Sequence, residues 1–217
     1  MEIVNMCFAS SKDFNIYFVH LIRKEILNRT ANLIVSGGRS IKPFIRYLQD
    51  VEWPNGFSAT LFLSDEYIEK DLVLNSNAAE LDILTGNSNF DIKFKFEGKH
   101  YSEAVRKYDA ELAKVEWFDY AVLGVGSDGH ISSLFENNFV QDSESIYSAF
   151  SIHNSPKAPR KRLTITYNTL AKCKKIVLLY VGKEKSEVFK SGKLFFIEHL
   201  VKLNPELIVY RCFIELV

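Results

Sequence analysis

The feature that most constrains this sequence is a regular alternation of short apolar runs with amphipathic, helix-like stretches. The apolar runs predict strands at residues 32–36, 59–63, 118–124, 163–166 and 175–181. The run Phe118–Gly124 is almost entirely apolar, which is typical of a strand buried on both faces of a parallel sheet. Strands that alternate with helices predict a parallel sheet, because parallel neighbours are joined by crossover connections.

The stretches between these runs have the spacing of amphipathic helices. The first places its apolar residues at Phe14, Phe18, Leu21, Ile22 and Ile26. We expect Asp13 to cap this helix and Pro43 to lie in the first turn of the next. The remaining segments are predicted helices at Ser76–Leu84, Tyr101–Val115 and from about Lys183, and a last apolar run at Leu207–Val217. The expected fold class is α/β: one domain over residues 1–217, with a mainly parallel sheet and helices on both faces in a Rossmann-like, three-layer arrangement.

Composition excludes several classes of protein. The formal net charge is zero, which argues against a nucleic-acid partner, because a basic excess supplies most of that affinity. The start, Met1–Ser11, lacks a basic region followed by an apolar run, and no apolar stretch approaches the roughly twenty residues of a membrane span. Cys7, Cys173 and Cys212 are scattered and are expected to be small buried apolar side chains. We therefore expect a cytoplasmic protein without a membrane partner.

Polar clusters directly follow three of the predicted strands. They are Ser36-Gly37-Gly38-Arg39, Ser64-Asp65-Glu66 and the loop from Gly124 to His130. Ligands bind at the carboxyl ends of the strands in sheets of this kind, so we expect the clusters to share one edge. The pair Gly37-Gly38 precedes a helix and suits a phosphate, although a plain strand-to-helix turn explains the pair equally well.

The third cluster, Gly124-Val-Gly-Ser-Asp-Gly-His130, is the most informative. Its three glycines expose main chain to a ligand, and the loop brings an acid and a histidine to the same space. The apolar segment Ile131–Phe135 is expected to begin a helix, with Ser127 or Asp128 as its cap.

The run from Phe118 to Phe135 resembles the signature of the 6-phosphogluconolactonases, a branch of the glucosamine-6-phosphate isomerase/6-phosphogluconolactonase superfamily. Five shorter segments follow the order of that family, and the similarity spans about Ile34 to Lys190. The segments are Ser36–Arg39, Ser64–Glu66, Ser76-Asn77, Pro159–Thr164 and Gly182–Lys185. The sister deaminases continue the loop with a phenylalanine-asparagine-glutamate-proline stretch, whereas this chain continues with Ser132-Ser-Leu-Phe135, the lactonase version.

The chain departs from the family pattern at several positions. Tyr67 occupies a position where the lactonases usually have an arginine, and Arg39 could supply a guanidinium instead. Ile41 and Glu136 replace the usual prolines, and the family's tryptophan-containing ending is not recognisable in Leu207–Val217. These departures place one substrate contact in question.

The resemblance implies hydrolysis of 6-phospho-D-glucono-1,5-lactone to 6-phosphogluconate in the pentose phosphate pathway. His130 is the natural general base, because imidazole titrates near neutral pH, and a helix N-terminus beside it would disfavour the imidazolium. Asp128 orients this imidazole or holds a sugar hydroxyl, or it only caps the following helix.

The resemblance also implies a phosphate site formed by Arg162 and Lys185, with main-chain donors from Gly37 and Gly38. Other residues expected at the site are Ser36, Arg39, Asp65, Glu66, Asn77 and Gly126. The five histidines show no close ligand spacing, so we predict an enzyme without a metal or cofactor.

Two other functions remain open at this point. A sugar-phosphate isomerase or glucosamine-6-phosphate deaminase on the same fold would use a carboxylate, most plainly Asp65, to abstract a proton alpha to a carbonyl. A non-catalytic sugar-phosphate sensor is favoured by Tyr67 and the altered ending. The expected partner is a small phosphorylated sugar lactone, and the expected state is a monomer or weak homodimer.

Overall fold

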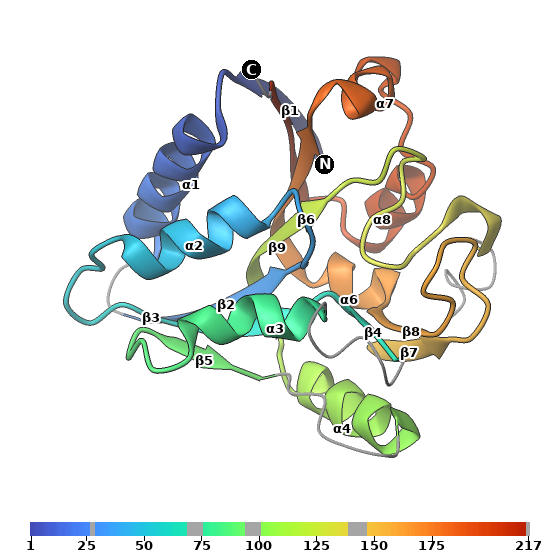
Figure 1. Cartoon of the computed structure of the whole chain (residues 1–217), viewed down its shortest axis with the longest axis horizontal. Helices are drawn as coiled ribbons and strands as arrows, with labels where there is room; N and C mark the ends of the chain where they lie inside the picture. The colour runs from blue at the N-terminus through green and yellow to red at the C-terminus, as the bar shows by residue number, and fades with distance from the viewer. Residues whose placement is uncertain (27–28, 69–75, 94–100, 139–146, 216–217) are drawn as a thin grey trace.

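The computed structural model describes residues 1–26, 29–68, 76–93, 101–138 and 147–215. Its main element is a seven-stranded sheet in the order β1-β10-β9-β6-β2-β3-β5, in which every neighbouring pair is parallel (Figure 1). The strands are β1 (Glu2–Phe8), β2 (Thr30–Val35), β3 (Ser58–Leu63), β5 (Phe90–Ile92), β6 (Phe118–Gly124), β9 (Cys173–Val181) and β10 (Ile208–Ile214). The predicted α/β class with a mainly parallel sheet is confirmed.

A second, three-stranded antiparallel sheet lies beside the main one. It consists of β4 (Asp65–Tyr67), β8 (Arg162–Ile165) and β7 (Ala149–Ile152), with β8 in the middle. The predicted strand at 163–166 therefore pairs antiparallel and lies outside the parallel sheet. This small sheet places Asp65 opposite Thr164 and Tyr67 opposite Arg162, so it joins two of the predicted site segments.

Helices cover both faces of the main sheet (Figure 1). On one face α1 (Ser11–Glu25) packs against α2 (Lys42–Asp50), and on the other α6 (Tyr167–Ala171) packs against α8 (Ile197–Leu203). The remaining helices are α3 (Asn77–Leu81), α4 (Tyr101–Ala113) and α7 (Ser186–Ser191), with 3-10 turns at 82–84, 136–138 and 183–185. The predicted cap at Asp13 is wrong, because the Ser10 hydroxyl accepts the Asp13 N–H at 3.2 Å and α1 begins at Ser11.

Two predicted helical segments differ in the structure. Residues 131–135 form no helix: Val125 and Ile131 form an isolated antiparallel bridge, and Ser132 has a φ of 52° that no right-handed helix allows. The helix expected from Lys183 is divided, since Gly192 takes a left-handed conformation at the end of α7.

The N-terminal strand β1 was not predicted. It is an edge strand, and Cys7 on it is exposed, whereas Cys173 and Cys212 are buried as expected. The last predicted run is strand β10, and its final residues 216–217 lie outside the described residues. Among the helices described, none is both long and apolar enough to span a membrane.

The strand order reverses between β2 and β6, which are neighbours in the sheet. From β2 the chain moves outward through β3, whereas from β6 it reaches β9 on the other side. Such a switch point leaves a crevice beyond the carboxyl ends of the two strands. The loops that follow β2 and β6 are joined there, because the Gly124 N–H donates to the Ser36 hydroxyl at 2.9 Å.

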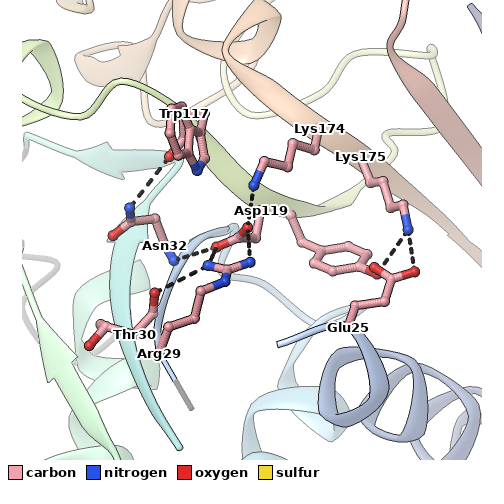
Figure 2. Close-up of polar contacts among 9 residues, drawn as sticks. Glu25, Arg29, Thr30, Asn32, Trp117, Asp119, Lys174 and Lys175 are labelled. Atoms are coloured by element: carbon pink, nitrogen blue, oxygen red, sulfur yellow. Dashed lines mark hydrogen bonds and ion pairs between the residues drawn. The ribbon is translucent and has the colours of Figure 1, made fainter. Parts of the chain in front are cut away.

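A network of charged residues connects the amino-terminal ends of β2, β6 and β9, at the edge of the sheet opposite the crevice (Figure 2). Asp119 accepts hydrogen bonds from the Arg29 guanidinium at 2.7 and 2.8 Å, from the Asn32 N–H at 3.1 Å and from Lys174 at 3.1 Å. Burial acts to raise the pKa of Asp119, but these donors outweigh it and hold the pKa below its ordinary value. The charged groups at this end are thus paired with one another.

Candidate active site

A cavity of about 390 Å³ opens at the carboxyl edge of the sheet, at the switch point between β2 and β6. Ten of the twelve predicted site residues line it, and Asp128 and Glu66 do not. The ten are Ser36, Gly37, Gly38, Arg39, Asp65, Asn77, Gly126, His130, Arg162 and Lys185. Segments that are distant in the sequence therefore meet at one site, as the positions of the polar clusters after the strands predict.

His130 lies in the wall of this cavity and is held on two sides. Its Nδ1 is hydrogen-bonded to the Asp128 carboxylate, and its ring stacks on Phe135 with centroids 4.4 Å apart. Asp128 also pairs with Lys157 at 3.0 Å. An ionised carboxylate only accepts hydrogen bonds, so Nδ1 carries the hydrogen and Nε2 retains a lone pair.

The charge states of this pair follow from its surroundings. Burial would raise the pKa of Asp128, but the bonds from His130 and Lys157 lower it to about 2. Burial also lowers the pKa of His130, and Lys157 adds to that effect, whereas Asp128 opposes it. Because no helix begins at residue 131, burial replaces the expected helix N-terminus as the reason that the imidazole stays neutral.

Gly126 is required for the position of the pair. A Cβ atom at this residue would overlap Nδ1 and Cε1 of the His130 ring and would lie 2.6 Å from the Asp128 Oδ1. His130 and Asp128 therefore pack directly onto the bare main chain of Gly126.

Besides Arg162, three cationic side chains line the cavity: Arg39, Lys157 and Lys185. Arg39 is exposed, Lys157 is half-buried, and Lys185 reaches the Ser40 hydroxyl with its Nζ at 2.7 Å. Burial lowers the pKa of Lys185; Glu184 opposes this, and the nearby charges of Arg39 and Lys157 add to it. Positive groups that repel one another in a cavity are stabilised by an anion bound between them.

The loop Ser36–Arg39 is packed against α3 and the residues around it. The Asn77 side chain packs so closely on Gly37 that any Cβ there would collide with it, and its amide donates to the Asp65 carbonyl at 2.9 Å. The Gly38 N–H already donates to the Glu80 carboxylate at 2.7 Å. This donor, which was expected to face a phosphate, is thus already engaged within the protein.

Arg162 is buried and most of its donors are engaged. Its Nε donates to the Pro159 carbonyl at 2.8 Å, one terminal nitrogen to the carbonyls of Lys157 and Ala158, and the other to the Ser133 hydroxyl at 3.3 Å. The guanidinium also lies over the Tyr67 ring, 5.0 Å from its centroid. Arg162 therefore has little capacity left for a phosphate, and it holds the residue 157–159 segment against the cavity.

The two acidic residues after β3 have different environments. Asp65 lines the cavity, and its two oxygens accept from the hydroxyls of Ser64 at 2.9 Å and Ser133 at 2.8 Å. Burial raises the pKa of Asp65, and these hydroxyls and Arg162 oppose the rise. Glu66 is turned away from the cavity and accepts from the backbone N–H groups of Tyr67, Asn77 and Ala78, which fixes the start of α3.

Nine further residues line the cavity wall besides the ten predicted ones. They are Ser40, Tyr67, Ser127, Ser132, Lys157 and Glu184, together with Gly124, Val125 and Val181. Only one feature of the sequence could have indicated Lys157 as a site residue, and it is weak: Lys157 lies five residues before the predicted site residue Arg162. Among the described residues, no group of three histidine, cysteine, aspartate or glutamate side chains is placed to hold a metal ion.

Known proteins resemble this chain over most of its length. The 6-phosphogluconolactonase of Borreliella burgdorferi is 32% identical over 199 residues, which cover 81% of this chain and 80% of that protein. The crystal structure of the 6-phosphogluconolactonase from Thermotoga maritima matches with a TM-score of 0.75 at 22% identity, over 98% of this chain and all of that one. A 6-phosphogluconolactonase structure from Shewanella baltica matches with a TM-score of 0.80 at 19% identity, over 98% of each chain. At such identities the two structures support the shared fold.

A family profile decides the relationship. The profile described as glucosamine-6-phosphate isomerases/6-phosphogluconolactonase matches residues 10–194, a span that contains every residue of the cavity wall. Together with the relative at 32% identity, this match establishes that the chain belongs to the glucosamine-6-phosphate isomerase/6-phosphogluconolactonase family.

Proposed function

We propose that this protein hydrolyses 6-phospho-D-glucono-1,5-lactone to 6-phosphogluconate, with His130 as the general base that activates water. One observation carries the proposal: a neutral, carboxylate-oriented imidazole and a group of cations line the same cavity. Relatives named 6-phosphogluconolactonase, with similarity over most of the chain, support the same substrate.

The phosphate of the substrate is assigned to Arg39, Lys157 and Lys185, with the Ser40 hydroxyl and the main chain of the loop at Gly37. A phosphate dianion between these groups would relieve their mutual repulsion, and a guanidinium and ammonium groups are its usual partners. Arg162, with its donors engaged, is proposed to act mainly by holding the wall that carries Lys157. Binding of the phosphate would then fix the lactone carbonyl relative to His130.

The chemical step is proposed to begin at Nε2 of His130. This nitrogen removes a proton from water as the oxygen attacks the lactone carbonyl, and the imidazolium later gives the proton to the departing ring oxygen. Asp128 holds Nδ1–H, keeps the ring in one tautomer and stabilises the imidazolium while it exists. General base catalysis of this kind contributes about two to four orders of magnitude.

A deaminase or isomerase would require a carboxylate base, and Asp65 is the candidate. Both of its oxygens already accept a hydrogen bond from a serine hydroxyl, so a substrate proton would have to compete with these two donors. We therefore favour the lactonase. Asp65 and Asn77 are proposed to shape the sugar subsite, and Glu66 to support α3.

The testing experiment follows acid release from freshly prepared 6-phosphogluconolactone, with spontaneous hydrolysis subtracted. A lactonase accelerates this release and yields no ammonia from glucosamine 6-phosphate. Ammonia release without lactone opening would identify a deaminase, and phosphosugar binding without either reaction would identify a sensor. We also propose that the protein acts in the cytoplasm as a monomer or weak homodimer.

A further inference from the structure

Ser132 differs in its backbone from every other non-glycine residue of the cavity wall. Its φ of 52° is the only positive φ outside glycine among the residues that the structure describes. The residue lies in the wall of the cavity, two positions after His130, and is only 6% exposed. A side chain in the left-handed region strains the backbone, and such strain is concentrated at ligand sites.

The Ser132 hydroxyl has no hydrogen-bond partner among the described residues, although it is buried. Its neighbours are paired with one another: the Ser133 hydroxyl donates to Asp65 at 2.8 Å and accepts from Arg162 at 3.3 Å. An unpaired buried hydroxyl is unfavourable, so a ligand atom that pairs with it gains the hydrogen bond that the free protein lacks.

We infer that the Ser132 hydroxyl binds one hydroxyl group of the sugar part of the substrate and so helps to select that sugar; this inference rests on the proposed function. The group is neutral and can both donate and accept, which matches a sugar hydroxyl. The proposed function already assigns the phosphate to Arg39, Lys157 and Lys185, which line the same cavity. The inference requires that one staggered rotamer of Ser132 brings its hydroxyl to the cavity that the residue lines.

The experiment compares wild type with Ser132→Ala on four lactones, made by oxidising glucose 6-phosphate and its 2-, 3- and 4-deoxy forms. With wild type, the kcat/KM of one deoxy lactone should be about three- to tenfold lower than that of the other two deoxy lactones. This is the range expected for the loss of one neutral hydrogen bond. Ser132→Ala should lower kcat/KM for the parent by the same factor and have no further effect on that one deoxy lactone. An equal loss on all four lactones, or no loss on any, would overturn the inference.

Ser132→Gly separates the hydroxyl from the backbone. Glycine adopts this φ without strain and also lacks the hydroxyl, so its kinetics should match those of Ser132→Ala while its Tm is equal to or above that of wild type. Wild-type kinetics in Ser132→Gly would show that only the backbone matters and would refute the inference. If wild type opens no lactone, the proposed function fails by itself. In that case, calorimetry would compare wild type and Ser132→Ala in their binding of 6-phosphogluconate and its deoxy forms, with the same pattern expected in the affinities. A wild type that binds none of these compounds would also refute the inference about Ser132.

Discussion

Replacing Gly126 by alanine should disable the catalytic pair without removing any functional group. The added methyl would overlap the His130 ring and lie 2.6 Å from the Asp128 Oδ1, where an ordinary contact is at least 3.4 Å. The imidazole and carboxylate must therefore shift by about 1 Å, and a misplacement of that size costs about a hundredfold in rate. We expect Gly126→Ala to lower kcat by about two orders of magnitude, with the affinity for 6-phosphogluconate changed by less than about threefold.

Gly124→Ala is the matched control, because it also adds one methyl to a glycine of the cavity wall. Its Cβ would lie 3.5 Å from the Ser40 Cβ and 3.8 Å from Ile41 and from the Ser36 hydroxyl, which are ordinary contacts. Its initial rate of lactone opening should stay within about threefold of wild type. Circular dichroism and Tm establish that both variants fold. A Gly126→Ala enzyme that is folded and as fast as wild type would refute the close packing of His130 and Asp128 on this glycine as a requirement for catalysis.

Three further predictions address the charges of the site and of the opposite edge. Asp128 raises the pKa of His130, so Asp128→Asn should lower kcat and move the acid limb of the kcat/KM profile to lower pH; a limb that moves to higher pH contradicts this sign. Lys185→Ala should raise KM at least about tenfold with a smaller effect on kcat, whereas the exposed neighbour Lys183→Ala should leave KM unchanged. Asp119→Ala should lower the free energy of unfolding by about 2 kcal/mol, which is a fall in Tm of about 4–8 °C, and should leave kcat/KM unchanged. Equal Tm values for variant and wild type would show that this network contributes nothing measurable to stability.

The strands and helices of the fold could largely be predicted, because each is indicated by residues that are adjacent in the sequence. The apolar run Phe118–Gly124 specifies a doubly buried strand, and polar residues after it mark the carboxyl edge. The cap of α1 was assigned three residues too late, since Ser10 and Asp13 are both good capping residues and only the backbone conformation decides between them. The edge strand β1 gave little signal, because half-exposed edge strands lack a continuous apolar run.

About half of the residues that line the cavity were predicted from the sequence, but their contacts were not. Ten predicted residues meet at one cavity, because chain topology alone brings the loops after β2 and β6 together. The roles of individual side chains depend on partners far away in the sequence. Arg162 is occupied by carbonyls of its own segment, and the Gly38 N–H by Glu80, which no spacing rule indicates. The helix expected at 131–135 is absent: Ile131 forms bridges with Val125 and Leu134, which helix propensity does not indicate, and Ser132 takes a left-handed φ.

His130, in the wall of a cavity lined by cations, is proposed to activate water for attack on a phosphorylated lactone. The most direct measurement is the initial rate of 6-phosphogluconolactone opening by wild type and by His130→Ala, together with the affinity of each for 6-phosphogluconate. We expect wild type to accelerate opening and His130→Ala to lose about 10²–10⁴-fold of that rate with its affinity retained. A folded His130→Ala protein that opens the lactone as fast as wild type would contradict the account.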